Sequence, residues 1–204
     1  MAWLTKAELL RAFQREYPKD LDRTTEGGTL LEYDFDRKKA EALVGVKWEN
    51  IRADQLQELF DIACLLNPRA FQYFFPAFIM ESQVNIEKTN LLVESLINML
   101  ANSGIHWPES LRAAETKFLS ENPEIAEAIA LINENDLRAW SEKRWRLFTE
   151  QQWVVIQKWL RWIAQDERWD VDREVLARAL ENAEKWREHA KSRSSTGRIS
   201  SEPP

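Results

Sequence analysis

The sequence predicts an all-α, or nearly all-α, protein built as a single-domain helical bundle. Apolar residues recur at three- and four-residue spacing through most of the chain, which is typical of amphipathic helices. Glycine is scarce, with five residues among 204, so the chain offers few of the tight turns that β-hairpins need. A chain of this length with 44% hydrophobic residues can bury one ordinary core and does not favour two. We therefore expect one helical domain over residues 1–191.

The N-terminal region predicts one helix followed by a loop. Residues 2–17 carry apolar side chains between charged ones, and Thr5 followed by Glu8 forms a capping-box pattern. We expect this helix to end near Pro18. Residues 17–28 are largely polar and end in Gly27-Gly28, so we interpret them as a mobile loop. These glycines lack the following Lys and Ser or Thr of a phosphate-binding loop.

Residues 29–36 hold the one alternating pattern of the chain. The pattern fits a short strand, but no second strand is evident to pair with it. An extended segment lying on the helices is therefore an equal alternative. Clustered carboxylates can bind hard cations, yet a solvated face explains them better here. Apolar and acidic residues alternate in the order Leu31, Glu32, Tyr33, Asp34, Phe35 and Asp36.

The densest apolar run, residues 65–80, is expected to form the centre of the core. Asn67 can cap a helix, and Pro68 fits its first turn. Tyr73 lies on a different side from the phenylalanines, and its hydroxyl needs a hydrogen-bond partner. Pro76 cannot donate to the carbonyl one turn earlier, so we expect the helix to bend or restart there. Four phenylalanines at helical spacing are expected to share one face: Phe71, Phe74, Phe75 and Phe78.

Further helices are predicted on both sides of this run. One lies at 37–44, where Gly45 can end it, and others lie at 56–64 and 86–100. Pro108 and Pro123 can open two more within residues 108–145. Cys64 lies on or beside an apolar stripe, with Asp61 rather than a cation nearby. We interpret it as a buried core residue rather than a nucleophile.

A helix at 150–166 carries the candidate binding residues. Thr149 and Gln152 form a second capping box before it. Its apolar arc is wide, and an edge tryptophan beside cations is typical of interface anchors. If another helix, such as one at 171–191, covered that tryptophan, the site would be lost. The candidate protein-binding residues are Val154, Lys158, Arg161 and Trp162.

The C-terminal part predicts a docked helix and a tail. Residues 171–191 carry an apolar stripe on an otherwise charged helix, so we expect this helix to pack on the body. Residues 192–204 are polar and without a pattern, and we expect them to be disordered.

Three stretches resemble a known family. The run Asn-Pro-Arg-Ala-Phe-Gln-Tyr-Phe-Phe-Pro-Ala-Phe at 67–78 resembles the signature of the bacterial domain-of-unknown-function family 6714. Trp48 with Ile51, and Phe148-Thr149-Glu150-Gln151, are similar to that family as well. The resemblance covers roughly residues 30–165. It implies a small helical protein and carries over no catalytic or binding residue.

The composition disfavours several classes of function. His106 and His189 are the only histidines, so a metal centre or a Ser-His relay has too few partners. The chain begins without the apolar core of a signal peptide, and no apolar run reaches the ~18 residues that span a bilayer. We expect a cytoplasmic protein with no membrane partner. The sequence predicts no catalytic residue, no cofactor and no metal.

Three classes of function remain, and a protein-interaction module comes first. Trp and Arg, which neighbour each other here, are enriched at interface hot spots. The expected partner is another protein or a second copy, as for an adaptor or an inhibitor or immunity-type partner. An enzyme using carboxylates such as Glu81 or Glu94 is the first alternative, although it needs a pocket.

A weak nucleic-acid binder is the second alternative, through residues 138–169. This segment carries seven Lys or Arg against four Asp or Glu, interleaved with tryptophans that could stack on bases. The whole chain has a net charge of −6, however, and nucleic-acid affinity comes from neutralising several phosphates at once. We therefore do not favour nucleic acid as the partner.

Overall fold

The computed structural model describes residues 3–22, 24, 38, 40–57, 66–103 and 141–196. These residues are mainly α-helical and contain no strand, so the all-α prediction is confirmed for this part of the chain. A short helical stretch at 141–145 precedes α10. The helices are α1 (Lys6–Ala12), the 3-10 helix η1 (Trp48–Asn50), α3 (Ala53–Gln57), α5 (Pro68–Val84), α6 (Ile86–Ala101), α10 (Glu150–Gln165) and α11 (Arg173–Thr196).

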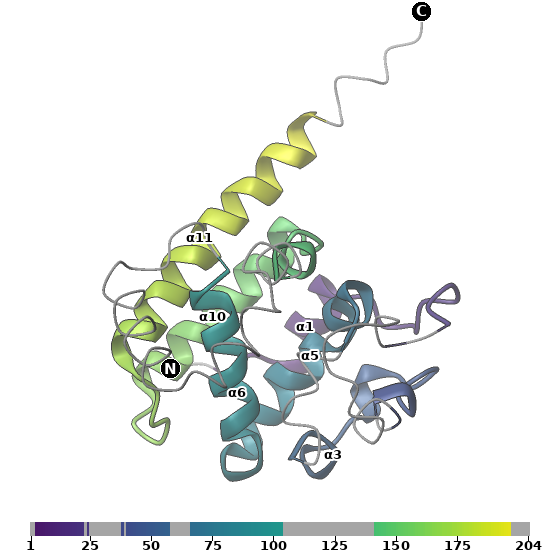
Figure 1. The fold of residues 1–204 in the computed structure, drawn as a ribbon, viewed down its shortest axis with the longest axis horizontal. Coiled ribbons are helices and arrows are strands. Elements are labelled where there is room, and N and C mark those ends of the chain that lie inside the picture. The colour runs from purple at the N-terminus through teal and green to yellow at the C-terminus, as the bar shows by residue number, and fades with distance from the viewer. Residues whose placement is uncertain are drawn as a thin grey trace, which may run out of the picture.

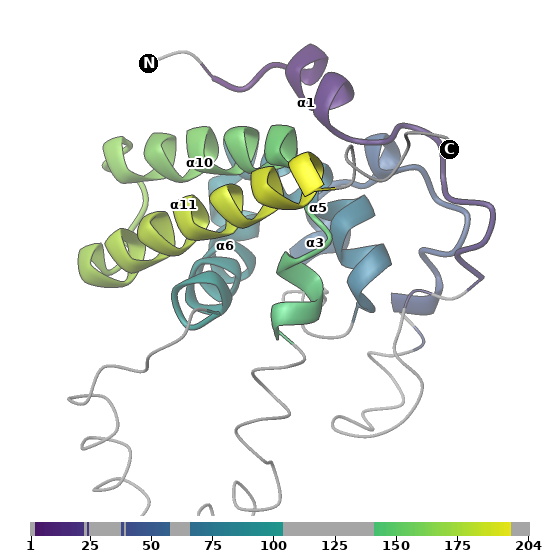
Figure 2. The same cartoon turned by 90° about the horizontal axis from the view of Figure 1, so that it is seen from above.

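The helices pack as a bundle around α5 and α6. α10 and α11 run side by side in opposite directions, and α11 also packs along α6 (Figure 1). α6 contacts α5 and α3, while α5 contacts η1. α1 lies on the outer side of α10 next to one of its ends, as Figure 2 shows. The N-terminal segment therefore meets a helix that follows it by about 140 residues in the chain.

α5 begins as the sequence predicts and continues through Pro76. The Asn67 Oδ1 atom accepts a hydrogen bond of 2.9 Å from the Ala70 N–H, and Pro68 occupies the first turn. Of the predicted bend or restart at Pro76, the restart is wrong, because one helix runs on to Val84. An interior proline costs a helix about 3 kcal/mol. The buried side chains on both sides of Pro76 offset that cost.

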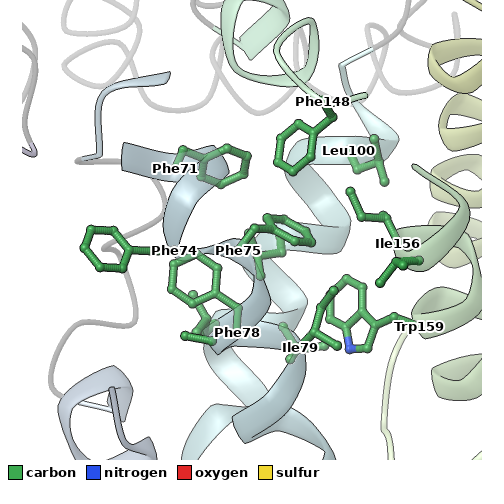
Figure 3. Close-up of a cluster of buried hydrophobic side chains, with 14 of the residues drawn as sticks. Phe71, Phe74, Phe75, Phe78, Ile79, Leu100, Phe148, Ile156 and Trp159 are labelled. Atoms are coloured by element: carbon green, nitrogen blue, oxygen red, sulfur yellow. The ribbon is translucent and has the colours of Figure 1, made fainter. Parts of the chain in front are cut away.

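The aromatic core centres on Phe75 (Figure 3). Its ring centroid lies 5.2 Å from that of Phe148 and 5.9 Å from that of Trp159. Phe71 and Phe78 share this side of α5 and contact Phe75 as well. Most of these pairs are edge-to-face, the arrangement that the ring quadrupole favours. All of these side chains are fully buried or nearly so.

Phe74 departs from the expected single face. Figure 3 shows its ring pointing away from Phe148 and Trp159. It belongs to a second aromatic group with Tyr17 and Tyr73, whose centroids lie 6.4 and 5.0 Å away. The Tyr73 hydroxyl donates to the Arg15 carbonyl at 3.1 Å, which supplies the partner that the sequence requires. Burial raises the pKa of this phenol to about 12.

The N-terminal predictions need two corrections. α1 ends at Ala12 rather than near Pro18, because Phe13 is extended and packs its buried ring against Phe148. Within the predicted mobile loop, Leu21 and Thr24 are buried. The Thr24 carbonyl accepts a hydrogen bond of 2.7 Å from the Asn67 N–H. Residues 25–28 and the expected strand at 29–36 lie outside the described residues.

The remaining boundaries agree or shift by a few residues. Gly45 has φ of +77°, in the left-handed region that glycine tolerates, but the helix predicted at 37–44 is already a turn from residue 42 onward. α11 extends to Thr196, past the expected end at 191, and the Arg193 guanidinium donates to the Phe148 carbonyl at 3.3 Å. The predicted tail is therefore helical over 192–196. Cys64 and His106 lie outside the described residues.

Candidate functional site

The predicted capping box fixes the start of α10. The Thr149 hydroxyl accepts a hydrogen bond of 3.3 Å from the Gln152 N–H, and the Gln152 side chain accepts one of 3.0 Å from the Thr149 N–H. Gln72 on α5 donates to the same Gln152 oxygen at 2.9 Å. This start fixes which side chains of α10 face outward. The core face is buried as predicted, whereas Val154 is 47% exposed.

Trp162 is not the exposed anchor that the sequence suggests. It is 5% exposed, because Trp3 and Trp169 cover its ring at centroid distances of 5.8 and 6.0 Å. The Gln83 side chain holds Trp3 in place through Leu4, since it accepts from the Leu4 N–H at 2.7 Å and donates to the Leu4 carbonyl at 3.3 Å. Trp3 precedes α1 and Trp169 follows α10, so the cover comes from two segments that are far apart in the sequence.

Lys158 is engaged within the chain. Its ammonium group donates to the Glu8 carboxylate at 2.5 Å, across 150 residues of sequence. The hydrogen bond from Lys158, followed by those from the Thr5 N–H and hydroxyl, lowers the pKa of Glu8 to about 2. Both side chains remain about a third exposed to solvent. The ion pair therefore joins α1 to α10 at the surface of the molecule.

The predicted site is thus brought together only in part. Val154 and Arg161 are exposed on α10, Lys158 is half-buried and Trp162 is buried. Trp3, which sequence reasoning did not select, takes the outer place and is 43% exposed. Its only sequence signal is a large aromatic residue just before the Thr5 cap. We call Trp3, Val154, Lys158 and Arg161 the α1–α10 surface.

The two carboxylates considered for catalysis, Glu81 and Glu94, differ in their burial. Glu81 is buried, and its Oε2 atom accepts hydrogen bonds from the Ala53 N–H at 3.0 Å and the Asn85 amide at 2.9 Å. Glu81 thereby caps α3 and holds the end of α5. Glu94 is exposed on α6. Within the described residues, no three His, Cys, Asp or Glu side chains come together as a metal site.

The basic segment provides no stacking surface in its described residues. Trp145 is fully buried and contacts Phe71, Phe75 and Phe148. Arg144 is fully buried too, and it donates to the Leu66 carbonyl. Base stacking requires exposed aromatic faces beside cations. Neither this tryptophan nor Trp162 offers one, and Trp140 lies outside the described residues.

A small cavity lies on the other side of α10, where the end of α6 meets α11 and the 141–147 stretch. Its volume is about 150 Å³. Asn182 closes the end of α6, since its amide donates to the Leu100 and Ala101 carbonyls at 3.0 and 2.9 Å. The lining residues are Ser103, Glu142, Arg146, Asn182, Lys185, Trp186 and His189. Sequence reasoning treated His189 only as one of two histidines and did not select the others.

Comparison of the chain with protein-family models, curated proteins and solved structures finds no match. The resemblance to family 6714 therefore stays a prediction. Among the helices of the described residues, none combines the length and apolar character needed to cross a membrane.

Proposed function

We propose that this protein is a protein-interaction module that binds an acidic surface of a partner protein through the α1–α10 surface. The observation that carries the proposal is the position of Trp3. Its indole is 43% exposed while one side rests on buried Trp162. A ring already held in place loses little conformational freedom on binding.

The setting of Trp3 supports an anchor role. Val154 adds an exposed apolar side chain on α10, and its neighbours one and two turns along are Lys158 and Arg161. Tryptophan and arginine are the residue types most enriched at interface hot spots. A partner that packs an apolar residue on Trp3 would meet the Arg161 guanidinium at the same time, beside the Lys158–Glu8 ion pair.

Charge favours an acidic partner. Arg161 is exposed and has no ion pair among the described residues. Arg11 lies three residues after Glu8 and is also exposed, so it adds a second cation on the same side of α1. The chain as a whole carries −6. A cationic patch on an acidic protein steers an acidic surface to this location and away from others.

The alternatives have less support. Glu81 is buried, and its Oε2 atom accepts two hydrogen bonds that hold α3 and the end of α5, so this carboxylate already has a structural role. Nucleic-acid binding through residues 138–169 would use Trp145 and Trp162, and both are buried. The interaction module needs only side chains that reach solvent.

The test compares Trp3→Ala with a matched control, Leu91→Ala. Leu91 is a 55% exposed apolar residue on α6, away from the α1–α10 surface. The immobilised protein is used to isolate a stoichiometric partner from lysate, and the purified partner is then titrated against each variant. We expect Trp3→Ala to weaken binding by about 2 kcal/mol, roughly 30-fold, and Leu91→Ala to leave it unchanged.

Charge reversal supplies the second arm of this test. Arg161→Glu should weaken the same complex most strongly at low salt, because exposed charges are screened within about 8 Å at physiological ionic strength. Equal affinity of the wild type, Trp3→Ala and Arg161→Glu for the partner would refute the proposal. Melting temperatures within a few degrees of one another would show that the variants are folded.

A further inference from the structure

The cavity beside α6 has a preformed polar floor. The last carbonyls of a helix have no partner within the helix. Here the Asn182 amide donates to two of them, and the Ser103 hydroxyl donates to the Leu100 carbonyl at 2.8 Å. The Trp186 indole N–H in turn donates to the Ser103 oxygen at 3.1 Å. These bonds fix the floor without a ligand.

The aromatic wall is fixed as well. One face of Trp186 stacks on Trp153 at a centroid distance of 6.4 Å and an interplanar angle of 6°. The His189 ring lies 5.8 Å from Trp186 and is exposed at the mouth of the cavity. A wall held from behind keeps its shape when a ligand enters, so binding orders few side chains.

The charged groups at the rim form two ion pairs. Arg146 bonds to Glu142 at 3.0 Å through one terminal nitrogen, and Lys185 pairs with Glu181 at 2.7 Å. A guanidinium has five donors and an ammonium three. Both cations therefore keep donors for a further acceptor. Glu142 is the one carboxylate that lines the cavity.

The end of α6 adds little uncompensated negative charge to the cavity. A helix C-terminus carries a partial negative charge that comes from its unbonded carbonyls and fades within one turn. The Leu100 and Ala101 carbonyls point at Asn182 donors, and Leu100 receives the Ser103 hydroxyl too. Both carbonyls therefore already have hydrogen-bond donors within the fold.

We propose that this cavity binds a small carboxylate with a short apolar tail. The carboxylate would take the remaining donors of Arg146 and Lys185, and the tail would lie against the Trp186 ring. A volume of about 150 Å³ admits a few heavy atoms and is too small for a nucleotide. The site is separate from the α1–α10 surface, because Trp186 meets α10 at Trp153, whereas Glu8 of α1 pairs with Lys158 and Trp3 covers Trp162.

The test uses propionate as the probe and propanamide, its neutral isostere, as the ligand control. Each tryptophan of the nitrogen-labelled protein gives one indole N–H signal in NMR spectra, and Trp186→Phe identifies the signal of Trp186. We expect propionate, added at constant ionic strength, to shift that signal with saturation and a Kd on the order of 1–10 mM. Propanamide should give no saturating shift.

Variants locate the bound anion. Lys185→Gln and the double variant Arg146→Gln with Lys185→Gln should raise the Kd by about 3-fold and at least 10-fold respectively, since each loses charge-assisted hydrogen bonds. The matched control is Lys191→Gln, an exposed cation of α11 that does not line the cavity. Its Kd should equal that of the wild type.

Three results would overturn the inference. They are a saturating shift with propanamide equal to that with propionate, an unchanged Kd in the double variant, and no saturating shift of the Trp186 signal in the wild type. Unaltered positions of the other indole signals in each variant would show that the fold is intact.

Discussion

The aromatic core around Phe75 and the attachment of α1 to α10 are held together by different forces. The core consists of rings that are almost completely removed from water and meet edge to face. α1 buries fewer apolar side chains and adds polar contacts, such as the Lys158–Glu8 ion pair and the bonds between Gln83 and Leu4. Burial of apolar area is insensitive to salt and pH, whereas exposed ion pairs respond to both. The two regions should therefore fail under different conditions.

The largest effect is expected in the core. Phe75→Ala removes the ring that contacts Phe71, Phe78, Trp145, Phe148 and Trp159. It should lower the free energy of unfolding by about 3–5 kcal/mol, measured by urea denaturation. Pro76→Ala at the next position should change it by less than about 1 kcal/mol, because relief of the helix cost of an interior proline is offset by the cavity that its buried ring leaves. Equal losses in the two variants would contradict this view of α5.

The second prediction concerns Trp162, where α1 and α10 meet. Trp162→Ala should cost about 3 kcal/mol, because its buried ring supports both Trp3 and Trp169. Val154→Ala on the exposed face of the same helix should cost less than about 0.5 kcal/mol. If Trp162→Ala proved as stable as Val154→Ala, the Trp162 ring would not support the fold, and Trp162 would again be a candidate binding residue.

A smaller effect is expected at Glu49, which ties both ends of the α1 region to η1. Its carboxylate is 9% exposed and pairs with Lys6 at 2.9 Å and Arg15 at 3.0 Å. The hydrogen bond from Lys6, with a further one from Arg15, lowers the pKa of Glu49. Glu49→Gln should lower the free energy of unfolding by about 1–2 kcal/mol, because two ion pairs are lost. The loss is no larger because the freed cations of Lys6 and Arg15 can return to water. A cost that does not shrink in 1 M salt would argue against an electrostatic origin.

The smallest effect is the acid sensitivity of the Lys158–Glu8 pair. The pKa of Glu8 is lowered from 4.5 to about 2, so the pair stabilises the fold fully above pH 4.5. That contribution falls as the pH drops from about 4.5 to 2. Because the pair is partly exposed, we expect about 1 kcal/mol between the wild type and Glu8→Gln at pH 7. The difference should disappear near pH 2, and a constant difference across this range would refute the assignment.

The features that the sequence could predict are those that depend on residues close together in the chain. The capping boxes at Thr5 and Thr149, the Asn67 cap and the left-handed Gly45 all form as expected. Each cap depends on residues three apart, whose geometry is set by the helix itself, and the conformation of Gly45 depends on its own missing side chain. The apolar arc of α10 was predictable for the same reason.

Contacts between distant segments were not predictable. Trp3 covers Trp162 only because Gln83 holds Leu4, so the burial of Trp162 depends on three separate parts of the chain. The cavity likewise combines Ser103, Glu142 and Asn182 from elements far apart in the sequence. A helical period tells which face of α10 is apolar, but it does not tell what covers each edge. This is why Trp162 was chosen where Trp3 is the exposed ring.

The docking of α1 also has a consequence for the order of events during synthesis. Glu8 meets a lysine 150 residues later in the chain, and Phe13 and Trp3 meet rings at comparable separations. At about 5–20 residues per second, a ribosome needs roughly 7–28 s to reach α10 after it has made α1. During that interval Trp3, Leu9 and Phe13 have no final place to pack. The nascent N-terminal segment is therefore the part of this protein that a chaperone has the longest time to meet.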